Sequence, residues 1–185
     1  MKVVFVGSFS TGKTTMANLF ADEWHYPRLP QVERHVVELG FPLDQSATAE
    51  TETLIFLKQW HTELEHDRFV SDYSLFHVLA YADWVMENAA ERKENHLWRE
   101  AREIATFGLS SRYDHVFYLP IEFPIVPDEL RPDDPAFQAE IDSRVHRLLD
   151  TYGVPYHTLT GSIEERQDRV RALVSDVADR GAAGR

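Results

Sequence analysis

The chain of 185 residues is 43% hydrophobic and has no cysteine, so it can form one well-packed domain without disulfides, thiolate metal sites or cysteine nucleophiles. Its formal net charge of -12 disfavours binding to duplex nucleic acid or to anionic membranes. No apolar run is long enough to span a bilayer and the N-terminus lacks the pattern of a signal peptide, so we expect a cytoplasmic protein without membrane contact.

The N-terminal segment has the order strand, glycine-rich loop and helix. Residues 2–6 have the pattern of a short buried strand, and residues 15–21 have that of an amphipathic helix. Between them, residues 7–14 match the phosphate-binding loop pattern G-x-x-x-x-G-K-[ST]. The order of these three parts is the one that a phosphate-binding loop requires, so the match predicts binding of a nucleoside triphosphate.

Each residue type in this loop has a chemical role. Gly7 and Gly12 allow the tight turn in which backbone N–H groups converge on phosphate oxygens. Lys13 brings a positive charge to the β- and γ-phosphates, and the hydroxyl of Thr14 is suited to binding Mg²⁺. The residues that we assign to nucleotide binding here are Gly7, Ser10, Thr11, Gly12, Lys13, Thr14 and Thr15.

Strands and helices alternate along the rest of the chain. A proline-punctuated segment, residues 26–34, is expected to hold a short second strand that ends near Glu33. Asp133 or Asp134 is expected to cap a helix that starts at Pro135, and a capping box is expected at residues 162–165. The other expected elements are helices at 48–66, 75–90, 97–107, 135–152 and 162–179, and strands at 68–72, 114–119 and 155–159.

This alternation predicts an α/β fold of the three-layer P-loop NTPase type, with about five mostly parallel strands and helices on both faces. We expect a single P-loop kinase domain at residues 1–180 and a frayed tail at residues 181–185. Residues 120–134 contain four prolines, and such a long proline-rich connection is typical of a functional lid.

Asp72 is the most informative residue outside the loop, because it follows a predicted strand at the edge where the phosphate loop lies. Its carboxylate could hold Mg²⁺ through water or take a proton from a substrate hydroxyl. Alternatively, Asp72 could cap the following helix, and these roles are compatible. Arg131, a cation in an otherwise acidic lid, could neutralise charge on a transferred phosphoryl group when the lid closes.

Candidate substrate contacts are less sharply defined. Glu33 and Arg34 could bind a substrate hydroxyl and a phosphate, or form a solvated pair on a loop. Aromatic side chains on helical faces usually belong to the core, and Trp60 and Phe76 are the ones we assign to a substrate pocket. None of the nine histidines has a metal-ligand spacing.

Together these motifs resemble the small P-loop kinases related to the ribosylnicotinamide kinase domain of bacterial NAD biosynthesis proteins, a group also described as AAA-type ATPases. The similarity to deoxynucleoside and thymidylate kinases is more distant. The resemblance covers nearly the whole chain and rests on the order of its segments: the phosphate loop, residues 32–34, Gln59, and residues 69–72, 79–83, 113–119, 128–131 and 161–166.

The resemblance implies a phosphotransferase that uses ATP and Mg²⁺ to phosphorylate a hydroxyl of a nucleoside-like molecule. It implies that Asp72 is the catalytic acidic residue, Arg131 is the lid arginine, and Gly161 and Ser162 lie near adenine. The chain departs from the family at Tyr73, where an arginine commonly follows the acidic residue. Another residue would then have to make the contact with substrate or phosphate that this arginine makes, and Arg34 and Arg112 are the candidates.

The sequence therefore predicts a kinase in which Lys13, Asp72 and Arg131 act in catalysis, and Thr14 and Asp72 bind Mg²⁺. One alternative acceptor is a hydroxymethylated pyrimidine in DNA, which would make nucleic acid a partner only as a modified-base substrate. Another alternative is a nucleotide-hydrolysing switch without an acceptor, although the guanine-reading motif Asn-Lys-x-Asp is absent from the sequence.

Overall fold

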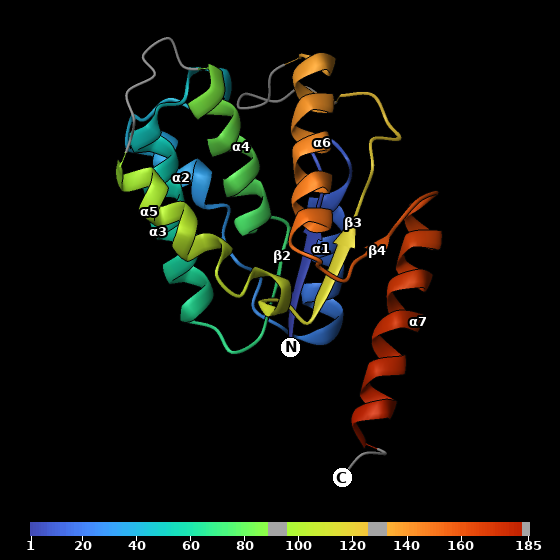
Figure 1. Cartoon of the computed structure of the whole chain (residues 1–185). Coiled ribbons are helices and arrows are strands. Elements are labelled where there is room, and N and C mark those ends of the chain that lie inside the picture. Colours follow the sequence, from blue (N-terminus) through green and yellow to red (C-terminus); the bar gives the residue numbers. More distant parts are fainter. Residues whose placement is uncertain (89–95, 126–132, 183–185) are drawn as a thin grey trace.

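The computed structural model describes residues 1–88, 96–125 and 133–182, which form three layers with a parallel sheet in the middle (Figure 1). The sheet has four strands in the order β2-β1-β3-β4 within these residues. The strands are β1 (Lys2–Val6), β2 (Phe69–Ser71), β3 (His115–Tyr118) and β4 (His157–Thr158). The predicted three-layer α/β fold is confirmed, with four strands instead of about five.

Nine helical segments surround the sheet in the described part of the chain. The α-helices are α1 (Lys13–Trp24), α2 (Val32–Glu38), α3 (Ala49–Leu64), α4 (Leu75–Asn88), α5 (His96–Thr106), α6 (Pro135–Thr151) and α7 (Ile163–Ala182), and the short 3₁₀ helices are η1 (Asp44–Ser46) and η2 (Leu109–Ser111).

The expected strand near Glu33 is wrong, because α2 begins at Val32 and contains that residue. Only a single bridge, between Arg28 and Val70, connects this segment to the sheet. Pro30 lies two residues after Arg28, and a proline has no N–H with which to continue a hydrogen-bonded ladder. The chain therefore leaves the sheet early, and Glu33 lies on the first turn of a helix.

The two faces of the sheet bury different helices, and the alternation along β1 shows how. Val3 and Phe5 face one way and pack against α1 and α7, whereas Val4 and Val6 face the other way, toward the larger cluster that contains α2 to α6. In Figure 1, α7 lies apart from α4 and α5, on the other side of the sheet. Because all four strands are parallel, their carboxyl ends lie together at one edge of the sheet.

Capping residues define the helix starts that the sequence predicts. The side chain of Asp134 accepts hydrogen bonds from the N–H groups of Ala136 and Phe137, both at 3.0 Å, with Pro135 at the first helical position. At α7, the N–H of Ser162 donates to Glu165 at 2.7 Å and the N–H of Glu165 donates to the Ser162 hydroxyl at 3.2 Å. The expected caps at these two helices are confirmed.

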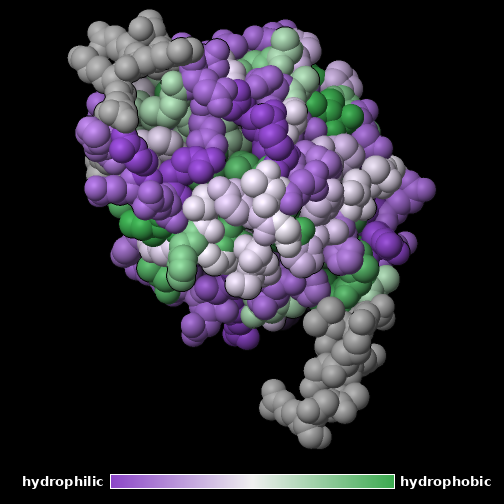
Figure 2. All heavy atoms as spheres, viewed as in Figure 1, coloured by the Kyte–Doolittle hydropathy of each residue, from purple (hydrophilic) through white to green (hydrophobic). Residues whose placement is uncertain are grey.

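The surface is mostly hydrophilic in the view of Figure 2, with apolar side chains in separate patches. In the described part of the chain, no helix has the length and apolar character needed to cross a membrane.

Gly7 provides a test of how closely the phosphate loop packs on the sheet. Its φ of +133° suits only glycine, and an added Cβ would lie 2.3 Å from the carbonyl oxygen of Leu119. We expect Gly7→Ala to lower the free energy of unfolding by at least about 3 kcal/mol in urea titrations. Gly153→Ala is the control, because φ is +59° there but a Cβ would meet no atom within 4 Å. We expect it to cost about 1 kcal/mol, and equal losses in the two variants would contradict the close packing.

Candidate active site

The phosphate loop connects β1 to α1 and leaves the amino end of the helix open. Gly12 precedes α1 with φ +93°, and no side chain caps the first turn. The N–H groups of that turn are therefore oriented for an anion, which the helix dipole also favours. The Lys13 ammonium donates to the carbonyl oxygen of Ser8, so its charge lies across the mouth of the loop.

His77, on α4, holds the start of the loop from the side of the larger core. Its Nε2 lies 3.0 Å from the carbonyl oxygen of Gly7, and the N–H of Ser74 donates to its Nδ1 at 3.1 Å. This pattern requires a neutral ring with the proton on Nε2. Burial, with the nearby charge of Lys13, lowers the pKa of His77 to about 3, so the ring stays neutral at physiological pH.

Two polar side chains of α6 hold the middle of the loop. Gln138 donates to the carbonyl oxygen of Phe9 at 2.7 Å. The carboxylate of Asp142 accepts the N–H of Ser8 at 3.1 Å and the hydroxyl of Tyr118 at 2.6 Å. The contacts with Ser8 and Phe9 join residues more than a hundred positions apart, so no local sequence pattern predicts them.

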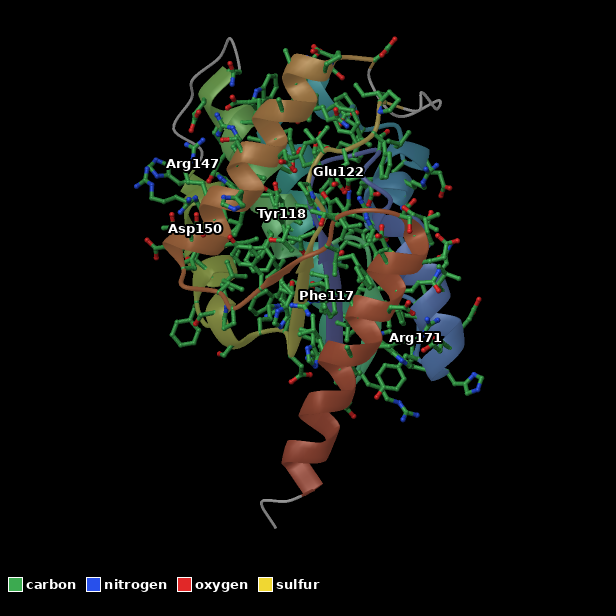
Figure 3. All side chains as sticks on the ribbon, turned by 90° about the vertical axis from the view of Figure 1, so that its right-hand side faces the viewer. Phe117, Tyr118, Glu122, Arg147, Asp150 and Arg171 are labelled. Carbon is green, nitrogen blue, oxygen red and sulfur yellow. The ribbon has the colours of Figure 1, made fainter. Side chains whose placement is uncertain are left out.

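Arg166, on α7, binds the far end of the loop and is only 2% exposed. Its guanidinium donates to the carbonyl oxygen of Thr11 at 2.8 Å and to the carboxylate of Glu122 at 2.6 Å, and it lies 5.1 Å from the ring of Phe123. Glu122 also accepts the N–H of Gly161 at 3.0 Å. Figure 3 shows Glu122 on the segment after β3, close to the start of α7. Sequence analysis did not identify Arg166 or Glu122.

Two cavities meet at the phosphate loop. One, of about 530 Å³, lies along the outer side of the loop, and its size fits a nucleotide. It brings together most of the predicted nucleotide-binding residues, and its lining includes Ser10, Thr11, Gly12, Lys13, Thr14, Thr15 and Ser162. Gly161 lies beside this cavity, bound to Glu122, while Gly7 lines the other cavity.

Asp72 follows β2 and lies directly against the phosphate loop. Its Oδ2 accepts the Thr14 hydroxyl at 2.6 Å and the Gln31 amide at 2.9 Å, and Nη2 of Arg28 lies 2.8 Å from its Oδ1. Burial acts to raise the pKa of Asp72, but Arg28, the Thr14 hydroxyl, Lys13 and Gln31 together hold it below the ordinary value. Asp72 is therefore a carboxylate at neutral pH.

The alternative role of Asp72 as a helix cap is wrong. The helix α4 begins only at Leu75, and the N–H of Leu75 donates to the hydroxyl of Tyr113 at 3.1 Å. The side chain of Asp72 is directed at Thr14 and Gln31 instead. The capping site is occupied by other groups, which leaves Asp72 to face the loop.

The second cavity, of about 100 Å³, extends from the loop toward α3 and is rich in carboxyl groups. Its lining includes Lys13, Thr14, Gln31, Glu33, Arg34, Leu43, Asp44, Glu52, Ile55, Asp72, Tyr73, His77 and Tyr81. Glu33, Arg34 and Asp72, which the sequence predicts as site residues, lie together in this lining. We refer to it as the acceptor cavity.

Two carboxyl groups in the acceptor cavity each have one buried oxygen without a hydrogen-bond partner among the described residues. Oε2 of Glu33 and Oε2 of Glu52 are buried and accept no hydrogen bond from the described residues. Burial raises the pKa of Glu33 to about 7, and the Asp72 carboxylate adds to the rise. Burial, and then the charge of Asp44, raises the pKa of Glu52 to about 8. The sequence does not point to Glu52, because a glutamate in the first turn of a helix ordinarily faces solvent.

Three predicted substrate contacts lie outside the acceptor cavity. Phe76 is fully buried in the core. Arg112 lies 4.0 Å from the ring of Trp60 and donates to Glu63 at 2.6 Å, just before the start of β3. That end of β3 is opposite the phosphate loop, so Arg112 does not replace the missing guanidinium. Arg131 lies outside the described residues.

The fold and loop place the protein among the P-loop nucleotide-binding proteins. The P-loop family described as "AAA domain" matches residues 2–166, and the chain belongs to this family. No curated protein matches the sequence.

Several solved structures share the fold. A NadR protein in complex with NR has a TM-score of 0.69 and 14% identity, covering 93% of this chain and 49% of its own, so this chain spans about half the length of that protein. A deoxyadenosine kinase from M. mycoides has a TM-score of 0.67, 9% identity and coverage of 96% and 100%. A thymidylate kinase from Ehrlichia chaffeensis has a TM-score of 0.59, 14% identity and coverage of 94% and 97%. The predicted family resemblance is confirmed at the level of fold.

The raised pKa of Glu52 predicts how stability changes with pH. Between pH 4.5 and about 8 the folded protein keeps the Glu52 proton while the unfolded chain releases it, so rising pH favours unfolding. Glu52→Gln removes this proton release. We expect the variant to gain stability over the native protein progressively from pH 5 to pH 8, as measured by urea unfolding at several pH values.

The matched control is Glu50→Gln, which changes an exposed glutamate on the same helix. Its unfolding curves should stay parallel to those of the native protein across this pH range. A parallel result for Glu52→Gln would contradict the burial of an unpartnered carboxyl group.

Proposed function

We propose that the protein is a kinase that transfers the γ-phosphoryl group of ATP, with Mg²⁺, to a hydroxyl group of a nucleoside-like small molecule. The observation that carries this proposal is the meeting of two cavities at Lys13 and Thr14, which line both. A nucleotide in the outer cavity would present its terminal phosphate at this junction, and an acceptor in the second cavity would meet it there.

Thr14 and Asp72 fit a site for Mg²⁺. Their oxygen atoms lie 2.6 Å apart beside the loop, and the low pKa of Asp72 keeps it ionised. Hydroxyl and carboxylate oxygens are the protein ligands that Mg²⁺ accepts. When bound, the ion would neutralise charge on the β- and γ-phosphates.

Glu33 is better suited than Asp72 to accept the proton of the acceptor hydroxyl. Asp72 has a lowered pKa and already accepts hydrogen bonds from Thr14 and Gln31, which makes it a weak base. Glu33 has a pKa of about 7 and a buried oxygen without a donor. A base is most effective when its pKa lies near the working pH. We therefore assign the base to Glu33 and the metal contact to Asp72.

The lid belongs to the same proposal. Residues 120–134 begin with the segment that contains Glu122 and Phe123, and both contact Arg166 beside the nucleotide cavity. Closing such a segment over the nucleotide would exclude water from the reacting phosphate. Arg131, in the same lid, would then approach the transferred group.

The nucleoside-like acceptor is supported by the related folds. The matched structures include a NadR protein with bound NR and a deoxyadenosine kinase with bound dATP. A hydrolytic switch would have no use for the acceptor cavity with its unpartnered carboxyl groups. A modified base in DNA would have to approach an acidic protein, with a net charge of -12, so the small molecule is preferred.

Lys13→Ala tests the phosphate-transfer assignment. We expect a loss of at least about 10²-fold in transfer from ATP to the best acceptor of a nucleoside panel that includes nicotinamide riboside, deoxyadenosine and thymidine. Mass spectrometry would detect the phosphorylated product, and circular dichroism would check the fold. Lys58→Ala, on α3 outside both cavities, is the control. Unchanged turnover in Lys13→Ala would refute the assignment.

The pH profile tests the choice of base. With Glu33 as base, kcat/KM should rise tenfold per pH unit below about pH 7, where the carboxyl loses its proton, and level off above it. Glu33→Gln should lose this rise and fall by about 10²- to 10⁴-fold. Asp72→Asn serves for comparison, since it should chiefly raise the Mg²⁺ concentration required. A flat profile from pH 5 to pH 8 in the native protein would exclude Glu33 as base.

A further inference from the structure

The acceptor cavity has two chemically different ends. Glu33 experiences the charges of Asp72, Arg34 and Lys13, which places it at the end where phosphate transfer would occur. The charge that affects Glu52 most is that of Asp44, on the short 3₁₀ helix η1 that precedes α3. A molecule with its hydroxyl group at Glu33 would therefore point its other end toward Glu52.

Tyr73 lines the cavity near both carboxyl groups. Its buried side chain is within electrostatic reach of both Glu33 and Glu52, and it stacks on His77 with ring centroids 5.1 Å apart. The phenol therefore forms part of the wall that an acceptor would meet beside Glu33 and Glu52.

Glu52 is buried and lines the same cavity. The residue is 2% exposed, and the lining includes the apolar side chains of Leu43 and Ile55 together with the carboxyl group of Asp44. Its Oε2 is buried and receives no hydrogen bond from any residue that the structure describes. A buried carboxyl group without a partner destabilises a protein, and each such group calls for an explanation.

A structural role would require a partner that Glu52 does not have among the described residues. Glu63 on the same helix shows the contrast, because it is equally buried but accepts hydrogen bonds from Gln59, Arg112 and Tyr113. The hydrogen bonds of Glu63 therefore link α3 to the segment before β3. Glu52 lines the cavity instead, where a bound molecule can supply a donor to its carboxyl group.

We propose that Glu52 determines the specificity of the acceptor cavity by accepting a hydrogen bond from an N–H group at the end of the acceptor remote from its reacting hydroxyl. The inference rests on the proposed kinase function and narrows the acceptor to molecules with a hydroxyl group at one end and an amino or amide group at the other.

An N–H group at the remote end of the acceptor suits the Glu52 carboxyl group in either protonation state. An ionised carboxylate accepts hydrogen bonds from amino groups and cations, and a protonated one pairs with an amide through its carbonyl and hydroxyl groups. An N–H donor is common to both cases. A molecule without that donor leaves the buried oxygen unpaired and loses affinity.

The test compares matched pairs of ribonucleosides that differ in this donor. Suitable pairs are adenosine with purine riboside, cytidine with pyrimidin-2-one riboside, and nicotinamide riboside with 3-acetylpyridine riboside. Their affinities would be measured by calorimetry with Mg²⁺ and a non-hydrolysable ATP analogue, separately from phosphate transfer. The native protein should prefer the N–H-bearing member of at least one pair by about 10- to 100-fold.

Two variants of Glu52 test its role, and one variant of Glu50 is the control. Glu52→Leu should reduce the preference to less than about 2-fold, whereas Glu52→Gln, which keeps an accepting oxygen, should restore part of it. Glu50→Gln should behave as the native protein. Both Glu52 variants should unfold at the native temperature or above it, because they remove an unpartnered carboxyl group.

Each outcome decides the proposal. The absence of any preference in the native protein, or an unchanged preference in Glu52→Leu, would overturn it. Failure of both Glu52→Leu and Glu52→Gln to fold would show a structural role and also overturn it. A preference that depends on Glu52, without transfer to any acceptor, would refute the kinase function and leave the role of Glu52 in binding intact.

Discussion

The phosphate loop depends on side chains that bind its backbone from behind. His77 and Arg166 contact the carbonyl oxygens of Gly7 and Thr11, from helices on opposite faces of the sheet. Gln138 and Asp142 bind the residues between them. With these backbone groups occupied, the remaining N–H groups stay directed toward the phosphate site. Helices from both layers therefore bind the same loop, which links them to each other and to the end of β1.

This support explains why a loop with unusual backbone angles keeps one conformation. Ser10 has φ +59°, and Gly7 and Gly12 also have positive φ. Such angles persist where surrounding contacts determine them. The neutral ring of His77 is part of this arrangement, because a charged ring could not accept the N–H of Ser74. The same side chains therefore order the loop before any nucleotide binds, which reduces the entropy cost of binding.

The sequence predicted features that depend on neighbouring residues. The loop pattern, the caps of α6 and α7 and the position of Asp72 at a strand end all follow from short segments. The strand near Glu33 was wrong because Pro30 ends the pairing, a local signal that strand periodicity outweighed. Glu52 and Arg166 could not be found, since their surroundings come from distant segments and charged residues on helices usually face solvent.

The tyrosine at position 73 changes how many protons the acceptor cavity holds. A guanidinium in its place would stabilise the ionised form of both Glu33 and Glu52, whose charges reach this position, and would lower their pKa values. The neutral, buried phenol gives no such stabilisation, and burial raises its own pKa well above the ordinary value. Glu33 and Glu52 therefore keep raised pKa values, so that each carboxyl group can hold a proton close to neutral pH.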